Sequence, residues 1–592
     1  MTATPMPTTA SPRRKGKTQA ASDGAERVEL SYTLAELPSA QHRAGLAGLL
    51  WLIEWLRQQG SVRGVCQVVS RERSRATLLF DREGLRGLFD ELYAASAELK
   101  PERQQRKDKK GDLIAPVKTE TREKTETDKA GKTKTKSETL YFYPTVIPRV
   151  RFLIDLDPQK SEDSLWVKLW RDMLWSILRG VPATRAPYEE RAAGETSQDA
   201  EDVFDSLLRP PTHALDLSST LYLGAQACTA ENVSFRDRAR YQLLLHFWPL
   251  IAQIYCPYVL DAQKGEREFV GYAIAIPDVA DLQRFLRAWE KMMHDRLPDK
   301  VAYRPQGTVI DLAVESALDL ADRLHKSIAT LEGEKGTRPA ILGIEVLHMN
   351  KEGNNVRLLS SDRLDPTFGQ LREYEQIKRA CWDVVFRRQR LLNLIKNRPW
   401  YFGFDGLAAT LPYKSQFFGS ARFRRDAFSH FEQLRKEMNE QEHEAASGSP
   451  SREAQDELSV AVYRLARSYV RRKVKSKHGL DWKDSFRNPE SMTPEDRRAR
   501  DAYAEKQEKV ASEAFLAVRG RTGTDFVEYF CGSLCSVPQA ISEANFQRIG
   551  RALRDKDSQA ELRILTLLAL SAAAYTSLDK KSESRPAADS HS

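Results

Sequence analysis

Hydrophobic positions in roughly the first 360 residues change their period repeatedly, which predicts an irregular mixture of strands and helices. Alternating apolar residues predict strands at 28–32, 65–69, 76–80, 140–143, 149–156, 217–223 and 268–276. Apolar residues at helical spacing predict helices at 42–58, 84–95, 164–178, 238–254 and 280–296. We therefore expect residues 27–437 to form a mixed α/β domain.

The pattern becomes helical after Pro366, with breaks at 398–419, 439–452 and 479–494. We expect residues 438–579 to form an all-helical bundle, so that the predicted fold class is α+β. Two alternating runs, 340–348 and 356–360, flank the Gly- and Asn-rich segment 350–355. This arrangement predicts a β-hairpin at 339–361.

Three segments lack the apolar residues that a core requires. Residues 1–26 and 580–592 are expected to be disordered tails, and 101–138 is a low-complexity stretch of Lys, Thr and Glu that we interpret as a flexible charged insertion. The insertion is either an inert loop or a basic arm that contacts nucleic acid.

Composition narrows the class of protein. A length of 592 residues suggests about three or four domains, and the net charge of +9 favours polyanionic partners. The six scattered cysteines do not form a disulfide pattern, and no signal peptide is visible, so we expect a cytoplasmic protein. The apolar runs 44–55 and 564–578 fall below the roughly 18–20 residues of a membrane span and predict buried helices.

No pattern of catalytic or metal-binding residues stands out. Residues 333–337 lack the spacing of a phosphate-binding loop, Cys531 and Cys535 have no nearby histidine and are expected to be core thiols, and His294–Asp295 has no second set of ligands. The pair Glu315 and Asp319 fits a solvated helix surface. We expect no catalytic residue, no metal and no cofactor, although scattered acids could still form a site in the folded chain.

Positive charge interleaved with aromatic rings recurs three times between residues 387 and 477. The basic members of these clusters are Arg387, Arg388, Arg390, Lys396 and Arg398; Lys414, Arg422, Arg424 and Arg425; and Arg464, Arg467, Arg471 and Lys475. On a helix, the last four fall within an arc of roughly 80°, with Leu465, Ala466 and Tyr469 on the other side. Such a row can neutralise phosphates, and neighbouring rings such as Trp400 and Phe417 could stack on unpaired bases. The alternative is a solvated basic face with aromatic residues in the core.

Four stretches, in their order along the chain, resemble one family. They are LAELPSAQHRAGLAGL at 34–49; GIEVLH at 343–348 with GNNV at 353–356; NRPWYFGF at 397–404; and DFV at 525–527 with CSVPQ at 535–539 and LTLLALS at 565–571. Together they resemble the large subunit of the type I CRISPR Cascade complex, in the so-called MYXAN variety related to subtype I-B.

The resemblance implies a non-catalytic subunit of an antiviral surveillance complex. Such a subunit binds the 5′ end of the guide RNA and the target double-stranded DNA, recognises the flanking motif, stabilises the opened duplex and recruits a separate helicase-nuclease. Its implied partners also include the backbone and guide-end subunits of Cascade, with no membrane. The hairpin turn could enter a groove through Lys351, Gly353, Asn354 and Asn355, although Gly and Asn also simply favour tight turns.

The bundle at 438–579 resembles the small subunit of related effectors, which in some of them is also made from an internal start; Met438, or else Met492, could serve as that start. Two other functions stay open: a metal-dependent nuclease whose site is assembled from scattered acids, and a protein-interaction scaffold that does not bind nucleic acid.

Overall fold

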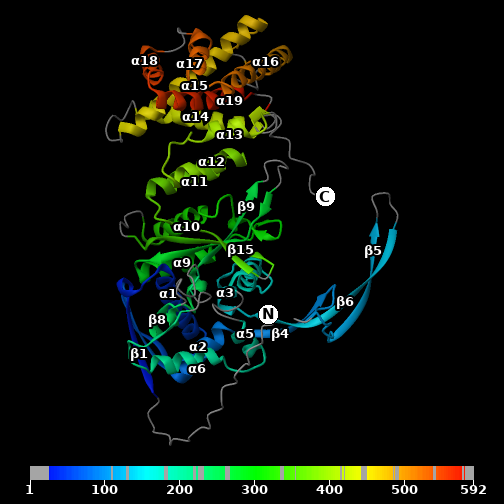
Figure 1. Cartoon of the computed structure of the whole chain (residues 1–592), viewed down its shortest axis with the longest axis vertical. Coiled ribbons are helices and arrows are strands. Elements are labelled where there is room, and N and C mark those ends of the chain that lie inside the picture. The colour runs from blue at the N-terminus through cyan, green and yellow to red at the C-terminus, as the bar shows by residue number, and fades with distance from the viewer. Residues whose placement is uncertain are drawn as a thin grey trace, which may run out of the picture. The chain divides into compact units, whose positions relative to one another are not determined.

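The structure is a computed structural model in which the chain forms two compact units. It describes residues 26–108, 111–127, 133–178, 185–217, 222–223, 233–260, 267–333, 339–353, 355–413, 417–418, 421–441, 450–483, 486, 492–537, 542–576 and 579. One unit comprises Met1–Ile251 with Val279–His294, and the other Ala252–Asp278 with Asp295–Ser592. The boundary expected at residues 437/438 stays a prediction. Figure 1 shows a mixed α/β N-terminal region and a helical C-terminal region, which confirms the α+β class.

The first unit combines small sheets with helices. Its strands are β1 (Arg27–Thr33), β2 (Cys66–Arg71), β3 (Arg75–Asp81), β4 (Ala95–Glu102), β5 (Lys118–Thr127), β6 (Thr133–Pro148), β7 (Ala214–Asp216) and β8 (Arg236–Arg238). Its helices are α1 (Ala40–Gln58), α2 (Arg82–Leu92), α3 (Arg151–Leu156), α4 (Leu165–Met173), α5 (Ala186–Ala192), α6 (Gln198–Leu207), α7 (Ala239–Leu244), α8 (Trp248–Ile251) and α9 (Leu282–His294). β3 lies between β1 and β2 and is antiparallel to both.

Helix α1 is the core element of this unit, as its apolar run predicts. Ser39 caps its N-terminus by accepting a hydrogen bond from the His42 amide. A side chain at Gly45 would lie 2.1 Å from the carbonyl oxygen of Leu244, so glycine allows the α7 segment to approach closely. On the other side of α1, the ring centroid of Trp51 lies 5.0 Å from that of Trp289 on α9.

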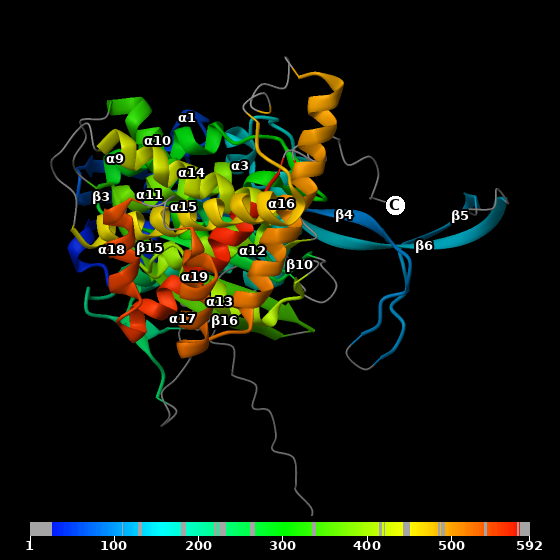
Figure 2. The same ribbon diagram turned by 90° about the horizontal axis from the view of Figure 1, so that it is seen from above.

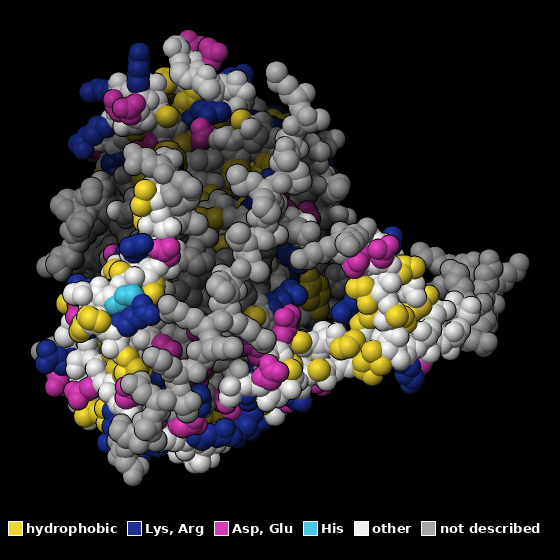
Figure 3. Space-filling model, turned by 60° about the horizontal axis from the view of Figure 1, so that its bottom comes forward, with side chains coloured by type: hydrophobic (Ala, Val, Ile, Leu, Met, Phe, Trp, Pro, Cys, Tyr) yellow, Lys and Arg dark blue, Asp and Glu magenta, His cyan; other side chains and the backbone are white. Residues whose placement is uncertain are grey.

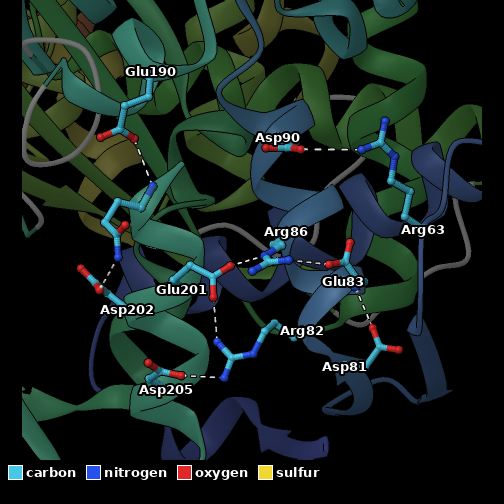
Figure 4. A network of polar contacts seen from close by, with 12 residues as sticks. Arg63, Asp81, Arg82, Glu83, Arg86, Asp90, Glu190, Glu201, Asp202 and Asp205 are labelled. Atoms are coloured by element: carbon cyan, nitrogen blue, oxygen red, sulfur yellow. Dashed lines mark hydrogen bonds and ion pairs between the residues drawn. The ribbon is translucent and has the colours of Figure 1, made fainter. Parts of the chain in front are cut away.

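Ion pairs join α2 to α6 at the surface of this unit. Arg82 contacts Glu201 and Asp205, each at 2.7 Å, and Figure 4 shows Arg86 between Glu201 and Glu83. Opposite charges on the two helices are therefore matched.

The segment 101–138, expected to be a flexible charged insertion, contributes to a three-stranded antiparallel ribbon. The strand order is β4-β6-β5, and Figure 2 shows the strands reaching out beyond the helices of their own unit. Threonine alternates with charged residues along β5 and the first half of β6, and the register pairs Thr121 with Thr139 and Thr125 with Thr135. Threonine favours strands, and this period of two was the signal that composition alone concealed.

A mainly antiparallel sheet begins the second unit. Its strands are β9 (Gln253–Leu260), β10 (Arg267–Phe269), β11 (Tyr272–Val279), β14 (Val309–Ile310), β15 (Ile341–Glu352) and β16 (Asn355–Leu364), in the order β10-β9-β11-β15-β16 with β14 paired to β9. β12 (Lys300–Val301) and β13 (Arg304–Pro305) form a separate pair. β15 and β16 are joined as an antiparallel hairpin around the predicted turn.

Helices make up the rest of this unit. They are α10 (Glu315–Glu332), α11 (Phe368–Ala380), α12 (Val384–Ile395), α13 (Phe404–Thr410), α14 (Ala421–Gln441), α15 (Pro450–His478), α16 (Pro494–Arg519), α17 (Gly523–Gly532), α18 (Glu543–Ala552) and α19 (Lys556–Ala574). α19 is buried from Ile564 to Ala574 and contacts α14, α15 and α16. Within the described ranges, no helix is long and apolar enough to cross a membrane.

Candidate nucleic-acid interface

Helix α15 presents a cationic face on the side away from the bundle core. Leu465, Ala466 and Tyr469 are buried, as the helical spacing predicts, while Arg464 and Arg471 are exposed. Arg464 forms no ion pair with any residue that the structure describes. Its guanidinium group is therefore available to a phosphate from solvent.

Other cations of the α15 row already have partners. Arg467 is half-buried and lies 3.3 Å from Glu432 of α14, and the Lys475 amine lies 2.6 Å from Asp481. The Arg471 guanidinium lies 5.7 Å from the ring centroid of Trp482. Lys475 and Arg471 stay exposed, so their contacts do not prevent them from reaching an anion, whereas Arg467 mainly connects two helices.

In the first predicted cluster, several cations are structural. Arg387 is ion-paired with the buried Asp311, Arg388 donates to the Asp311 carbonyl oxygen at 3.3 Å, and Arg390 is buried 3.1 Å from Glu373. Contacts within the protein therefore hold these three side chains, and their binding of nucleic acid stays a prediction.

The end of α12 differs from its middle. Lys396 and Arg398 are exposed, and the Arg398 guanidinium lies 4.6 Å from the ring centroid of Phe402. Phe402 is 44% exposed, so this arginine and ring form a surface pair. Of the first cluster, this pair together with Lys396 has the exposure that a nucleic-acid contact requires.

The second cluster is also divided. Arg424 is buried between Glu508 at 2.6 Å and Asp579 at 2.7 Å, so its charge is already matched within the protein, and a nucleic-acid contact there stays a prediction. Arg422 is exposed, and Arg425 is half-buried with its guanidinium carbon 3.3 Å from the ring centroid of Trp382. Lys414 lies outside the described residues.

Trp382 is the functional candidate that sequence analysis missed. Its side chain is 49% exposed, and its backbone N–H donates to Asp426 at 2.7 Å, next to the Asp383 N–H that donates to the same oxygen at 2.6 Å. Asp383 caps α12 by accepting from the Phe386 amide. The sequence does not distinguish this tryptophan from a core ring, because an apolar residue just before a helix cap often packs against the first turn of the helix.

The rings expected to stack on bases are mostly core residues. Trp400, Tyr401, Phe404, Phe417 and Phe423 are all less than one-tenth exposed. Phe386 packs against Phe404 and Phe423 with centroid distances of 5.1 Å and 5.4 Å. The interpretation as stacking residues is wrong for these rings, because their apolar area stabilises the junction of α12, α13 and α14.

The hairpin turn combines exposed polar groups with a backbone that requires glycine. Lys351, Gly353 and Asn355 are exposed, while Asn354 lies outside the described residues. Gly353 has a φ of 60°, a value that the common two-residue hairpin turns require at this position. Glycine is thus explained by the turn, and Lys351 and Asn355 are the described groups that could contact a groove.

The acids that could have formed an active site belong instead to a buried network of charged side chains. Glu315 and Asp319 are 6% and 1% exposed, so the expectation of a solvated helix surface is wrong. The Asp319 carboxylate lies 2.6 Å from Arg323 and 2.5 Å from Lys378. Burial would raise the pKa of Asp319, but the charges of Arg323 and Lys378 outweigh it and hold that pKa below its usual value.

Glu315 accepts hydrogen bonds from the Asp311 amide at 2.7 Å and from the Tyr374 hydroxyl at 3.2 Å. Burial, followed by the charge of Asp311, raises the pKa of Glu315 to about 7. Because Asp311 pairs with Arg387 and Asp319 with two cations, these acids are neutralised from within the protein. In the part of the chain that the structure covers, no group of three potential ligands could hold a metal ion.

The C-terminal cysteines differ from the expected core thiols. Cys531 is exposed and Cys535 is half-buried, so the prediction of a shared core position is wrong. Phe526 and Phe530 are the buried residues of the short helix α17, and Cys531 lies on its solvent side.

Comparison with protein families covers most of the chain. The family described as the type I-B CRISPR Cas8b N-terminal domain matches residues 65–334, and the type I-B CRISPR Cas8b C-terminal domain matches residues 341–573. A search of curated proteins found no match.

Proposed function

Since this chain belongs to the Cas8b family, the large subunit of type I-B CRISPR effector complexes, we propose that it binds the guide RNA 5′ end and target DNA without cleaving either. In this proposal it recognises the flanking motif, stabilises the opened duplex and recruits a separate helicase-nuclease. Guide–target pairing supplies most of the sequence specificity, and the protein contributes backbone contacts.

The observation that carries this proposal is a set of exposed cations and rings in the C-terminal unit. Arg464, Arg471 and Lys475 lie on one side of α15, and Trp382 and Phe402 are exposed rings with an arginine against each. Cations suit a phosphodiester backbone and rings suit unpaired bases, so the combination favours an unwound strand as ligand.

The buried network supports a non-catalytic role over the nuclease alternative. A metal-dependent nuclease needs carboxylates that are free to bind cations, whereas Asp311 and Asp319 are already paired with Arg387, Arg323 and Lys378. A nuclease site formed by other acids would be detected as cleavage by the purified chain.

The test uses the assembled effector complex with its guide RNA and a fluorescent duplex that carries the target and its flanking motif. We expect binding that weakens steeply with salt, and no cleavage in Mg²⁺ until the helicase-nuclease is added. Cleavage by the complex alone would support the nuclease alternative. Binding that is insensitive to salt would support the scaffold alternative.

A separate small subunit from an internal start is also proposed, with a constraint from the fold. Met438 lies near the end of α14. A product that starts at this residue would lack most of α14 and so would lose its packing against α19 and α15. Met492 follows α15, so a product starting at that residue would also lack the cationic helix. A single full-length band after expression of the intact gene would exclude both starts.

A further inference from the structure

Arg304 of β13 is a buried arginine without an acidic neighbour. It is 8% exposed, and among the residues that the structure describes none of its contacts is a carboxylate. Its guanidinium carbon lies 4.6, 5.3 and 5.0 Å from the ring centroids of Phe269, Tyr272 and Tyr303. Aromatic rings stabilise a cation only in part, so most of its charge is left to be neutralised.

A buried guanidinium needs an anion beside it. Arginine keeps its proton in proteins, and a charge removed from water is costly unless an opposite charge lies against it. At the surface, water and acids supply that charge, and Figure 3 shows lysines and arginines interspersed with aspartates and glutamates on one face of the molecule. Inside the unit, the fold has to supply it.

The thiol of Cys256 lies where that anion is needed. Nη1 of Arg304 donates to Sγ of Cys256 at 2.8 Å, and Nη2 donates to the Tyr303 hydroxyl at 3.2 Å. Cys256 is 0% exposed and lies on β9, and the Thr308 hydroxyl is 3.8 Å from the same sulfur. A neutral sulfur is a weak acceptor, whereas a thiolate accepts these bonds and also supplies the missing charge.

The turn that presents Arg304 has an unfavourable backbone. Ala302 and Tyr303 are the two central residues of the turn between β12 and β13. Ala302 has a φ of 54°, in the left-handed region that favours glycine. Such a conformation persists only where the surrounding contacts compensate for it, and the contacts of Arg304 with the rings and with Cys256 do so here.

Two other buried cysteines provide a comparison within the chain. Cys66 and Cys381 are each 6% exposed, and neither sulfur accepts a hydrogen bond from an arginine within the described ranges. Burial raises the pKa of both thiols to about 12, although the charge of Arg390 opposes this at Cys381. Both are therefore neutral thiols near pH 7, so burial alone does not produce a thiolate.

We propose that Arg304 holds Cys256 as a thiolate and that this sulfur is a site of oxidation by peroxides. The sulfur attacks one oxygen of hydrogen peroxide, so that an S–O bond forms, the O–O bond breaks and hydroxide leaves. Sulfur gives up two electrons, which reduce the peroxide. The hydroxide then takes the proton of the sulfenic acid, which yields water and a sulfenate. The guanidinium can donate to the new oxygen, since its buried Nε has no hydrogen-bond partner among the described residues.

The oxidant reaches the sulfur past Tyr303. This side chain is 69% exposed, and its hydroxyl accepts from Arg304, so the guanidinium lies directly beneath an exposed ring. Hydrogen peroxide is little larger than water and needs only a small displacement of this ring. Large alkylating reagents are excluded from a sulfur that has no exposed area.

The experiment treats the isolated full chain with hydrogen peroxide and follows each cysteine by mass spectrometry of its peptide. We expect the Cys256 peptide to gain one oxygen atom, or two where a second peroxide reacts, about tenfold faster than the Cys66 and Cys381 peptides. This rate should change little between pH 6 and pH 8. An ordinary thiol would react about a hundredfold faster at pH 8 than at pH 6, because its thiolate fraction rises with pH.

Two variants test the role of the cation. Arg304→Met removes the charge and keeps an apolar chain, so oxidation of Cys256 near pH 7 should slow about tenfold or more, since an ordinary thiol is only a few per cent ionised there. Arg304→Lys keeps the charge and should retain most of the rate. Thermal unfolding checks the fold of each variant. If Arg304→Met does not fold, the pH profile of the wild type and its comparison with Cys66 and Cys381 still decide.

Three results would overturn the proposal. They are oxidation of Cys256 no faster than that of the two other buried cysteines, a wild-type rate that rises with pH as it does for an ordinary thiol, and a folded Arg304→Met chain that is oxidised at the wild-type rate. The isolated chain is sufficient for each measurement, so the outcome is independent of the proposed role in an effector complex.

Discussion

The guanidinium carbon of Arg425 lies 3.3 Å from the ring centroid of Trp382, a residue that is 49% exposed. Asp426, the neighbour of Arg425, accepts hydrogen bonds from the backbone of Trp382 and Asp383. One short segment of α14 thereby fixes both the ring and the backbone of the α11–α12 junction. A ring fixed in this way can stack on a base without first being ordered.

Trp382→Ala is expected to weaken binding of single-stranded DNA by about 1–3 kcal/mol, the usual contribution of one stacked base. Trp382→Phe should retain most of the affinity, since it keeps a flat ring. Fluorescence anisotropy with an oligonucleotide measures the effect. Phe546→Ala removes a ring that is 51% exposed on α18 and serves as the control; an equal loss there would contradict a specific role for Trp382.

Arg464→Ala is expected to reduce the slope of log K against log salt for DNA binding by about 1, because one phosphate contact and its released counterion are lost. Titrations at several salt concentrations give this slope. Arg57→Ala on the first unit, where the guanidinium is paired with Glu54 at 2.7 Å, is the control and should leave the slope unchanged. An unchanged slope for Arg464→Ala would show that α15 does not contact the backbone.

Arg387→Met is expected to lower the free energy of unfolding by about 3–5 kcal/mol, because it leaves the buried Asp311 carboxylate without its ion-pair partner. Urea unfolding measures this change. Arg388→Met is the control on the same helix, since Arg388 donates to the Asp311 carbonyl oxygen rather than to a carboxylate, and it should cost about 1 kcal/mol. Undiminished stability of Arg387→Met with weaker DNA binding would contradict a structural role for the Arg387–Asp311 ion pair.

Glu315 should make the protein less stable as the pH rises from about 4.5 to about 7. Its pKa in the folded chain is about 7, against an ordinary value of 4.5, so within this interval the folded state holds a proton that the unfolded state has released. The stabilisation is complete below the unfolded pKa and is lost as the pH passes the folded pKa.

Glu315→Gln should therefore show a flatter dependence of unfolding free energy on pH than the wild type over this interval. Urea unfolding at a series of pH values measures the difference. The carboxamide oxygen can still accept from the Asp311 amide, so the fold is expected to persist. Identical pH profiles for the two chains would indicate that Glu315 titrates normally.

The hairpin turn is tested by Asn354→Ala with Asn355→Ala. We expect weaker binding of a target duplex without a change in guide loading, since asparagine can bond base edges while guide binding involves other contacts. Lys351→Ala should weaken binding to all duplexes alike, because it removes a phosphate contact. Unchanged affinity of the double variant for a correctly flanked duplex would leave the turn with a purely structural role.

Local pattern was sufficient for much of the fold. Apolar periodicity predicted α1, α15, α19 and the strands on either side of Gly353, because burial follows the period of each element. It failed at β5 and the first half of β6, where alternating threonines carry the strand signal and no apolar residue marks it. The family resemblance was also present in sequence alone, since it depends on the order of short motifs along the chain.

Sequence could identify which residues are charged, but only the tertiary structure decided which charges are free. Arg464 and Arg387 look alike along the chain; one faces solvent, and the other is paired with Asp311 across seventy-six positions. The same holds for Trp400, which is buried, and Trp382, which is exposed. The physical reason is that neutralisation and burial depend on partners brought together by packing, and a local pattern contains no information about those distant partners.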